Sequence, residues 1–273
     1  MATKKYKPTT PGLRKRVTLK LDQVTTSQPE KSLTKSLNKR SGRNNTGRIT
    51  VRHKGGGLKR RYRTIDFKRQ SNVEGKIVSI EYDPNRTSLI SLVHYKNGEK
   101  AYILTPSGVK VGDVIKSGDD VDINIGNAMS IRQIPTGALI HNIELTPGKG
   151  AQLVRSAGMH ALLMAKSSKY ATVKLPSGEI RLILLECIAT YGKIGNEAHY
   201  NTCYGKAGLS RKRNKRPTVR GSVMNPADHK HGGGEGRAPI GLSTPYTAYG
   251  KPARRKTRNK RKNTSHLVRA RKR

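Results

Sequence analysis

A glycine-rich segment in the last quarter of the chain carries the residues best suited to acid–base chemistry. Asp228 directly precedes His229, His231 follows, and three glycines come next. A histidine oriented by a carboxylate can act as a general base. No nucleophile is evident nearby, and a catalytic triad assembles from distant positions rather than from adjacent residues. An enzyme using Asp228 and His229 is therefore the weaker hypothesis, and an extended loop whose histidines donate hydrogen bonds to sugar or phosphate oxygens is favoured.

The same residues give no sign of a metal or cofactor site. His229 and His231 are separated by one residue, and Cys203 lies 26 residues before His229, which matches no standard closed zinc site. Cys187 and Cys203 form no CxxC pair, so reduced thiols are expected rather than a disulfide framework. Neither GxxxxGK[ST] nor GxGxxG opening a helix occurs, and nucleotide cofactors are unsupported.

A second glycine cluster, at residues 52–63, joins three glycines to a dense cationic run. Glycine lets a backbone approach a phosphate chain closely, and a flexible solvated linker is the alternative. Arg86 and Arg155 stand apart in a nearly neutral region. Either could be an ordinary exposed arginine, or could pair with a phosphate through both arms of its guanidinium.

Charge is strongly polarised along the 273 residues. Residues 1–72 hold 21 Lys/Arg against 3 Asp/Glu, residues 73–201 hold 14 against 12, and residues 202–273 hold 21 against 2. Such a distribution predicts a polyanionic partner bound by two flanks, which should stay extended until neutralised. The basic runs 254–262 and 269–273 are expected to form a tail of this kind. A generic polyanion or chromatin binder would share this charge pattern.

Other features narrow the class of protein. One Phe and no Trp argue against recognition dominated by aromatic stacking, although 11 Tyr leave some room for it. The longest apolar run, at 182–185, is too short to span a bilayer, so no membrane partner is expected. No apolar stretch typical of a signal peptide follows the basic N-terminal residues.

The elements that must position these segments are short strands with turns every 8 to 12 residues. Strands are predicted at 75–82, 89–95, 101–104, 109–115 and 121–125, with an Asn97-Gly98 hairpin turn before the third. Five strands suit a small barrel of the OB kind. A second barrel is predicted from strands at 138–145, 171–175 and 180–188. A short helix at 152–165 is expected between the first and second of these strands.

Several stretches closely resemble the bacterial and organellar form of the universal large-subunit ribosomal protein two family. They span nearly the whole chain in order: 5–12 (KYKPTTPG), 52–69 (RHKGGGLKRRYRTIDFKR), 80–86 (IEYDPNR), 141–144 (HNIE), 148–158 (GKGAQLVRSAG), 175–182 (LPSGEIRL), 216–221 and 224–236. The resemblance implies a mainly β protein with a basic N-terminal extension at 1–72, an OB-fold barrel at 73–130, an SH3-like barrel at 131–201 and a basic C-terminal extension at 202–273. Both extensions would be long and irregular.

The resemblance also implies a non-enzymatic structural constituent of the large subunit that needs no cofactor. Its expected partners are large-subunit rRNA, neighbouring ribosomal proteins, the small subunit through a bridge, and tRNA indirectly. It would support assembly and the peptidyl transferase region, in the cytoplasm of a bacterium or in a plastid or mitochondrion. The expected rRNA-binding residues are Arg52, His53, Lys54, Gly55, Gly56, Gly57, Lys59, Arg60, Arg61, Arg63, Lys68, Arg69, Arg86, Arg155, Arg211, Lys212, Arg213, Lys215, Arg216 and Arg220. Those expected near the peptidyl transferase centre are Asn225, Asp228, His229, His231, Gly232, Gly233 and Gly234.

The C-terminal extension departs from the family pattern at three places. Residues 211–214 (RKRN) stand where the family usually has Arg-Trp-Leu-Gly, Lys230 replaces a usual Pro, and 244–250 replaces a Thr-Pro-Trp-Gly pattern. The apolar anchors that Trp would provide are missing from this arm.

Overall fold

The computed structural model describes residues 2–254 and 266–270, and the chain divides into two compact units. The first contains residues 1–38, 59–207 and 265–273, and the second contains residues 39–58 and 208–264. Most of the predicted basic tail at 254–262 and the last three residues lie outside the described residues. The elements of the first unit before residue 74 are β1 (Thr3–Lys5), α1 (Pro11–Arg14), β2 (Val17–Leu19), η1 (Lys31–Leu33), β3 (Thr34–Ser36) and β4 (Arg61–Arg63).

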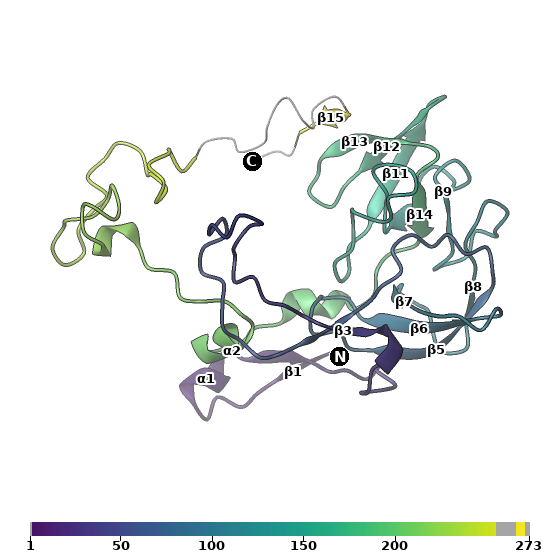
Figure 1. Cartoon of the computed structure of the whole chain (residues 1–273), viewed down its shortest axis with the longest axis horizontal. Helices are drawn as coiled ribbons and strands as arrows, with labels where there is room; N and C mark the ends of the chain where they lie inside the picture. The colour runs from purple at the N-terminus through teal and green to yellow at the C-terminus, as the bar shows by residue number, and fades with distance from the viewer. Residues whose placement is uncertain (1, 255–265, 271–273) are drawn as a thin grey trace. The chain divides into compact units, whose positions relative to one another are not determined.

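The first large sheet of this unit is antiparallel, with strand order β7-β6-β5-β8 (Figure 1). Its strands are β5 (Gly75–Glu81), β6 (Ile90–Tyr95), β7 (Lys100–Leu104) and β8 (Val114–Ile115). The predicted Asn-Gly hairpin is confirmed: Gly98 has φ +84° and joins β6 to β7, and the backbone N–H of Tyr95 donates to Glu99 O. A bulge in β5 between Ile77 and Ser79 helps to curl the sheet into the half-barrel of an OB fold.

The fifth predicted strand of this barrel is wrong. Residues 121–125 form no strand, and Ile123 and Ile125 are about half exposed, at 47% and 48%. The backbone N–H of Asn124 bonds to Asp122 O, and the Asn127 side-chain amide donates to the same carbonyl. These local bonds make a turn where β-branched residues alone had indicated a strand. Likewise, 109–113 is a loop, and only Val114–Ile115 pairs with β5.

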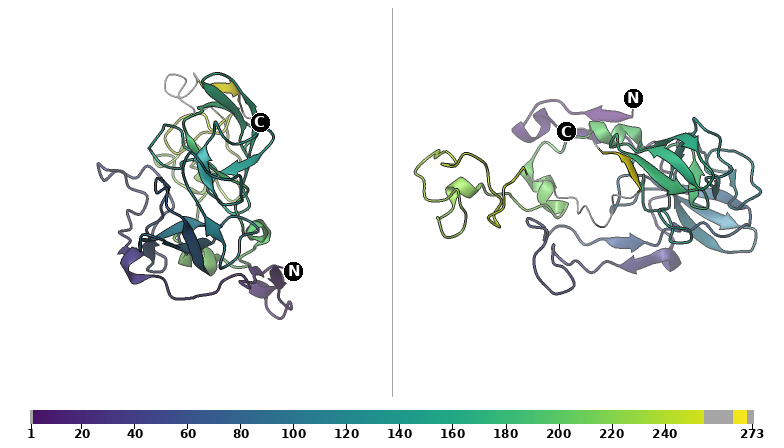
Figure 2. Two further views of the ribbon diagram at one scale, coloured as in Figure 1. Left: turned by 90° about the vertical axis from the view of Figure 1, so that its right-hand side faces the viewer. Right: turned by 90° about the horizontal axis from the view of Figure 1, so that it is seen from above.

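The second large sheet is the SH3-like barrel, with order β15-β13-β12-β11-β10-β14-β9. It comprises β9 (Ala128–Ser130), β10 (Leu139–His141), β11 (Ala161–Lys166), β12 (Tyr170–Lys174), β13 (Ile180–Leu184), β14 (Ile188–Tyr191) and β15 (Leu267–Arg269). Its core includes Ile131, Ile140, Leu163 and Val173, all fully buried. The C-terminal β15 lies beside β13 at the edge of the sheet, as both views in Figure 2 show.

The helix predicted at 152–165 is also wrong. Val154 and Gly158 have positive φ, of +54° and +69°, which a right-handed helix cannot accommodate. β11 then begins at Ala161 and alternates: Ala161 and Leu163 are buried, whereas Met164 is 45% exposed. The apolar spacing matched a helical stripe only because it combined an irregular loop with one strand.

Parts of the N-terminal flank are folded, contrary to the expectation of an extended arm. β1 pairs with β2, and β3 pairs with β4. Ile65 belongs to the core beneath the first sheet, with Leu33 and Phe67 packed against the same cluster. Apolar residues at these few positions repay the ordering of a segment whose average composition is polar. After β14, the first unit continues through η2 (Glu197–Asn201).

The second unit contains little regular structure. Its elements are most of α2 (Ala207–Lys212) and η3 (Gly221–Val223). Within residues 39–58 and 208–254, no hydrophobic side chain is fully buried. Backbone hydrogen bonds hold this unit in place of an apolar core.

Candidate nucleic-acid interface

Part of the glycine-and-cation segment at 52–63 pairs with the cationic residues at 212–216 in the second unit. Lys54 and Lys215 form an antiparallel bridge, and the backbone N–H of Arg216 donates to His53 O over 3.0 Å. Below this bridge, the N–H of Leu58 bonds to Lys212 O at 3.0 Å. Residues about 160 positions apart thus form one cationic ribbon.

Gly57 shows why glycine is required in this ribbon. Its φ is +78°, and a Cβ at this position would lie 2.8 Å from both Asn214 N and Lys212 O. Both atoms belong to the backbone, so neither can move aside without breaking the pairing. The Lys39 ammonium binds the other side of the turn, donating to the carbonyls of Gly56, Gly57 and Leu58 at 3.3, 3.0 and 2.8 Å.

The loop that precedes this ribbon is closed by one asparagine. Asn44 Oδ1 accepts hydrogen bonds from the N–H and hydroxyl of Thr46 and from the N–H of Arg48. Arg43 and Ile49 bridge across the loop. Sequence reasoning missed Lys39, Arg43 and Asn44, because it started at the glycines of 52–63. The absence of any Asp or Glu from residue 31 to residue 65 was the available signal.

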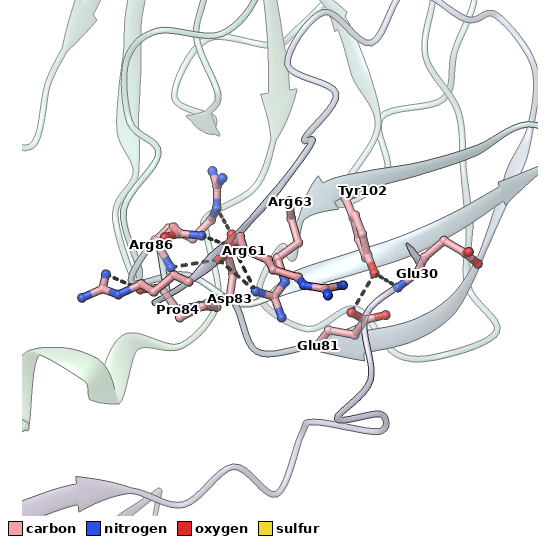
Figure 3. Close-up of polar contacts among 10 residues, drawn as sticks. Glu30, Arg61, Arg63, Glu81, Asp83, Pro84, Arg86 and Tyr102 are labelled. Carbon is pink, nitrogen blue, oxygen red and sulfur yellow. Dashed lines mark hydrogen bonds and ion pairs between the residues drawn. The ribbon is translucent and has the colours of Figure 1, made fainter. Parts of the chain in front are cut away.

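A second group of the expected residues gathers where β4 meets the loop after β5, drawn in Figure 3. Asp83 is fully buried; the Arg86 Nε lies 2.5 Å from its Oδ2, and the Arg63 guanidinium is 4.0 Å from its Oδ1. Arg60 donates to Pro84 O at 2.9 Å, and the Asn85 amide donates to Arg61 O at 2.7 Å. This carboxylate therefore anchors the cationic strand β4 to the barrel.

A neighbouring buried contact fixes the start of this loop. Tyr102 donates to Glu81 Oε2 over 2.8 Å, and the Glu30 backbone N–H donates to the Tyr102 hydroxyl at 2.7 Å (Figure 3). Burial, together with the hydrogen bond to Glu81, raises the pKa of Tyr102 well above its usual value. The phenol therefore stays protonated and ties residue 30 to the sheet.

Arg86 and Arg155 meet around the only phenylalanine of the chain. Their guanidinium carbons lie 5.8 and 4.9 Å from the centre of the Phe67 ring. Arg155 lies in the loop before β11 rather than on a helix, and its Nη1 donates to Ala151 O at 3.3 Å. Stacking on one ring orients both cations without neutralising them. Arg155 is exposed, whereas the Arg86 side chain is largely covered and ion-paired.

Arg69 differs from the other expected contacts because its guanidinium is turned into the protein. The residue is only 6% exposed. Nε donates to Ser117 Oγ, and Nη2 donates to the carbonyls of Lys116 and Gly126. Burial lowers the pKa of Arg69, although nearby Tyr95 and Asp66 oppose this effect. Contact between this guanidinium and RNA would require these bonds to open, so Arg69 stabilises the connection between the two barrels.

The remaining expected cations are accessible. Lys59, Arg61, Lys68 and the arginines and lysines at 211–220 are exposed. Arg52, Lys54 and Arg216 form no ion pair with the described residues. Their charge is thus available to an external anion.

The glycine-histidine loop is shaped by its own backbone. The N–H groups of Asp228 and His229 bond to Asn225 O, and the N–H of Gly233 bonds to Met224 O. A Cβ on Gly232 would lie 2.3 Å from Asn225 O, so this glycine permits the close turn. His229 is largely buried, while Asp228 is exposed.

Hydrogen bonds within the loop define the two histidines as acceptors. His229 Nδ1 accepts the N–H of His231 at 3.0 Å, and His231 Nε2 accepts the N–H of Tyr246 at 2.9 Å. A ring nitrogen that accepts a hydrogen bond does so through its lone pair. Burial and the neighbouring His229 lower the pKa of His231, which favours its neutral form. Among the described residues, no hydrogen bond joins Asp228 to His229.

No group of three or more His, Cys, Asp or Glu side chains in the described part of the chain could hold a metal ion. No described helix is both long and apolar enough to cross a membrane.

Comparison with known protein families gives two matches. The family described as Ribosomal Proteins L2, RNA binding N-terminal domain, matches residues 30–117. The family described as Ribosomal Proteins L2, C-terminal domain, matches residues 124–250. The matches include the cationic ribbon, both barrels and the glycine-histidine loop. The chain therefore belongs to the ribosomal protein L2 family and has a structural, RNA-binding role in the ribosome.

Proposed function

We propose that this chain is a primary rRNA-binding protein of the large subunit, with no enzymatic activity of its own. The two barrels, which we place at residues 73–130 and 131–201 with β9 and β15 joined to the sheet of the second, recognise a folded rRNA surface and set the register. The basic extensions at 1–72 and 202–273 enter crevices between RNA helices and release counterions. The family membership and the acid-free cationic ribbon support this proposal.

We further propose a supporting role in subunit assembly, subunit association, tRNA binding and the peptidyl transferase region. Neighbouring ribosomal proteins, the small subunit and, indirectly, tRNA would be its partners. The setting would be a bacterial cytoplasm or the interior of a plastid or mitochondrion. One ring nitrogen of His229 and one of His231 are already occupied by backbone N–H groups, which favours positioning of RNA over proton transfer in that region.

The single observation that carries the RNA-binding proposal is the ribbon formed by 53–58 and 212–216, because it presents Arg52, Lys54 and Arg216 without carboxylate partners. A triple variant with these three residues changed to Gln tests it. Each lost phosphate contact should reduce the slope of log K against log salt by about 0.7–0.9 on binding to large-subunit rRNA. The matched control changes three other lysines to Gln: Lys96, Lys100 and Lys193. In the unaltered protein these lysines already form ion pairs with Glu74, Glu30 and Glu197.

A smaller slope change in the control than in the ribbon variant is expected. Equal changes in both variants would contradict a specific cationic ribbon.

If the chain were instead a generic polyanion binder, the unaltered protein would bind duplex DNA and rRNA with equal affinity. UV crosslinking in cells, with sequencing of the bound RNA, should concentrate on large-subunit rRNA.

A further inference from the structure

The second unit contains a cavity of about 440 Å³ that phosphate contacts alone do not explain. Its walls come from residues 41–56 and from Arg216. The volume falls within the range of small-ligand sites, roughly 300–1,000 Å³. A cavity of this size can hold more than a phosphate group.

Two apolar side chains line this otherwise polar cavity. Ile49 and Val51 are each 51% exposed. Both belong to the lining, although the chain bends at Thr50 and Val51 rather than running as a strand. The N–H groups of Thr50 and Val51 both bond to Gly42 O, at 3.0 and 3.1 Å, which holds this segment in place. Apolar surface kept in water inside a cationic loop is a feature of a ligand site.

Cations surround the apolar wall. Arg43, Arg52 and Arg216 line the same cavity, and none forms an ion pair with a described residue. His53 belongs to the lining as well. The residues of the second unit that line this cavity include no Asp or Glu. The fitting ligand is therefore an anion with a flat, weakly polar part, a description that a nucleotide meets.

We propose that this cavity receives one unstacked nucleotide of the rRNA, with its base against Ile49 and Val51 and its phosphate toward the arginines. This inference rests on the proposed RNA-binding function and adds a site to it. RNA loops and bulges supply splayed bases, and proteins recognise such bases by contacts with their faces and edges. The cavity would accordingly set the register of this loop on a single-stranded part of the RNA.

A double variant, Ile49→Thr with Val51→Thr, tests the apolar wall without changing charge. Threonine keeps the β-branch, so the loop should persist, and the backbone amide signals at positions 50 and 51 check this in the unaltered and variant proteins. Loss of apolar contact should weaken binding to large-subunit rRNA roughly tenfold, with an unchanged salt slope. The matched control is Val219→Thr, which alters a side chain of the same unit that is 53% exposed and lies outside the cavity lining. Its affinity should remain at the unaltered value.

A second measurement examines the base directly. The methyl groups of Ile49 and Val51 are followed by NMR in the full chain during titration with adenosine 5′-monophosphate or ribose 5-phosphate. We expect adenosine 5′-monophosphate to cause ring-current shifts of these methyl signals and ribose 5-phosphate to cause none. Identical shifts with both compounds would identify a phosphate site only and would overturn the proposal, as would unaltered rRNA affinity in the double variant. Failure of the proposed function would look different, because the unaltered chain would then show no preference for rRNA over DNA.

Discussion

The barrels and the cationic second unit are stabilised in different ways. Every fully buried hydrophobic residue in the described chain lies between Ile65 and Ile194, within the first unit. The second unit depends on backbone bonds such as Arg216 N to His53 O, and on glycines that allow close approach. Burial of apolar surface therefore holds the barrels, whereas directional bonds between polar groups hold the cationic unit.

This difference shows how one chain can combine a stable scaffold with an RNA-binding surface. Apolar burial contributes roughly 25 cal/mol per Å² and is insensitive to surface charge. A segment dense in Lys and Arg repels itself, so it needs local bonds to keep a defined shape before an anion neutralises it. Residues that serve stability and residues that serve binding are thus largely separated along the sequence.

The largest expected contrast comes from truncating one leucine in each region. Leu163→Ala, in the core of the second barrel, should lower the free energy of unfolding by about 3 kcal/mol, since it removes a side chain that is fully buried. Leu58→Ala, at 60% exposure in the cationic unit, should change it by less than about 0.5 kcal/mol. Urea unfolding of both variants measures this difference. Equal losses would mean that the exposed Leu58 contributes as much to stability as the buried Leu163, and would contradict the contrast between the two regions.

The next contrast concerns pH. His141 is fully buried: its Nδ1–H donates to Gly192 O at 2.8 Å, and its Nε2 is enclosed without a partner. Burial lowers the pKa of His141 to about 4, from a usual value near 6.5. The unfolded chain therefore binds a proton first as pH falls. Stability should decrease by roughly 2–3 kcal/mol between about pH 6.5 and pH 4.

The barrels, rather than the cationic unit, should account for this pH dependence. Unfolding free energies measured across that range for the unaltered protein and for His141→Asn give the contribution of this residue. The variant should lose most of the decrease. The same pH profile in both proteins would assign the effect to other groups.

A third contrast separates two arginines that the sequence placed in the same class. Arg69→Gln should cost about 2 kcal/mol of stability, because three buried acceptors lose a donor. Its slope of log K against log salt on rRNA should stay unchanged. Arg52→Gln should do the reverse, reducing the slope by roughly one with little change in stability. A reduced slope for Arg69→Gln would indicate that the connection between the barrels opens on RNA.

The smallest contrast compares two glycines that have the same backbone φ angle. Gly57 and Gly47 both have φ of +78°, but only Gly57 lies against backbone atoms of another segment. Alanine at either position costs about 1 kcal/mol locally, and at Gly57 it should also separate 54–58 from 212–215. Amide exchange of Leu58, which donates to Lys212 O, should then accelerate in Gly57→Ala and stay slow in Gly47→Ala. Equal exchange in both variants would mean that the pairing does not depend on this contact.

Sequence periodicity predicted the paired strands well and the unpaired segments badly. The hairpin at Asn97-Gly98 was recognisable because its turn chemistry is local. Residues 121–125 and 152–165 were misassigned because their apolar spacing fits a regular element. Whether an apolar segment becomes a strand depends on a partner strand beside it. For residues 152–165, the positive φ at Val154 also prevents a helix. Neither condition can be read from a short window of sequence.

Composition and motif order by themselves determined the fold class, the polyanionic partner and the family, because charge and turn residues act locally and add along the chain. Tertiary structure alone decided which cations face outward. Arg69 and Arg52 are alike in sequence, yet one is buried against carbonyls and the other lines a cavity. Pairing of residues 53–58 with 212–216 also required the folded chain. Long-range contacts depend on which backbone groups find partners in the folded chain, and local sequence patterns do not reveal those partners.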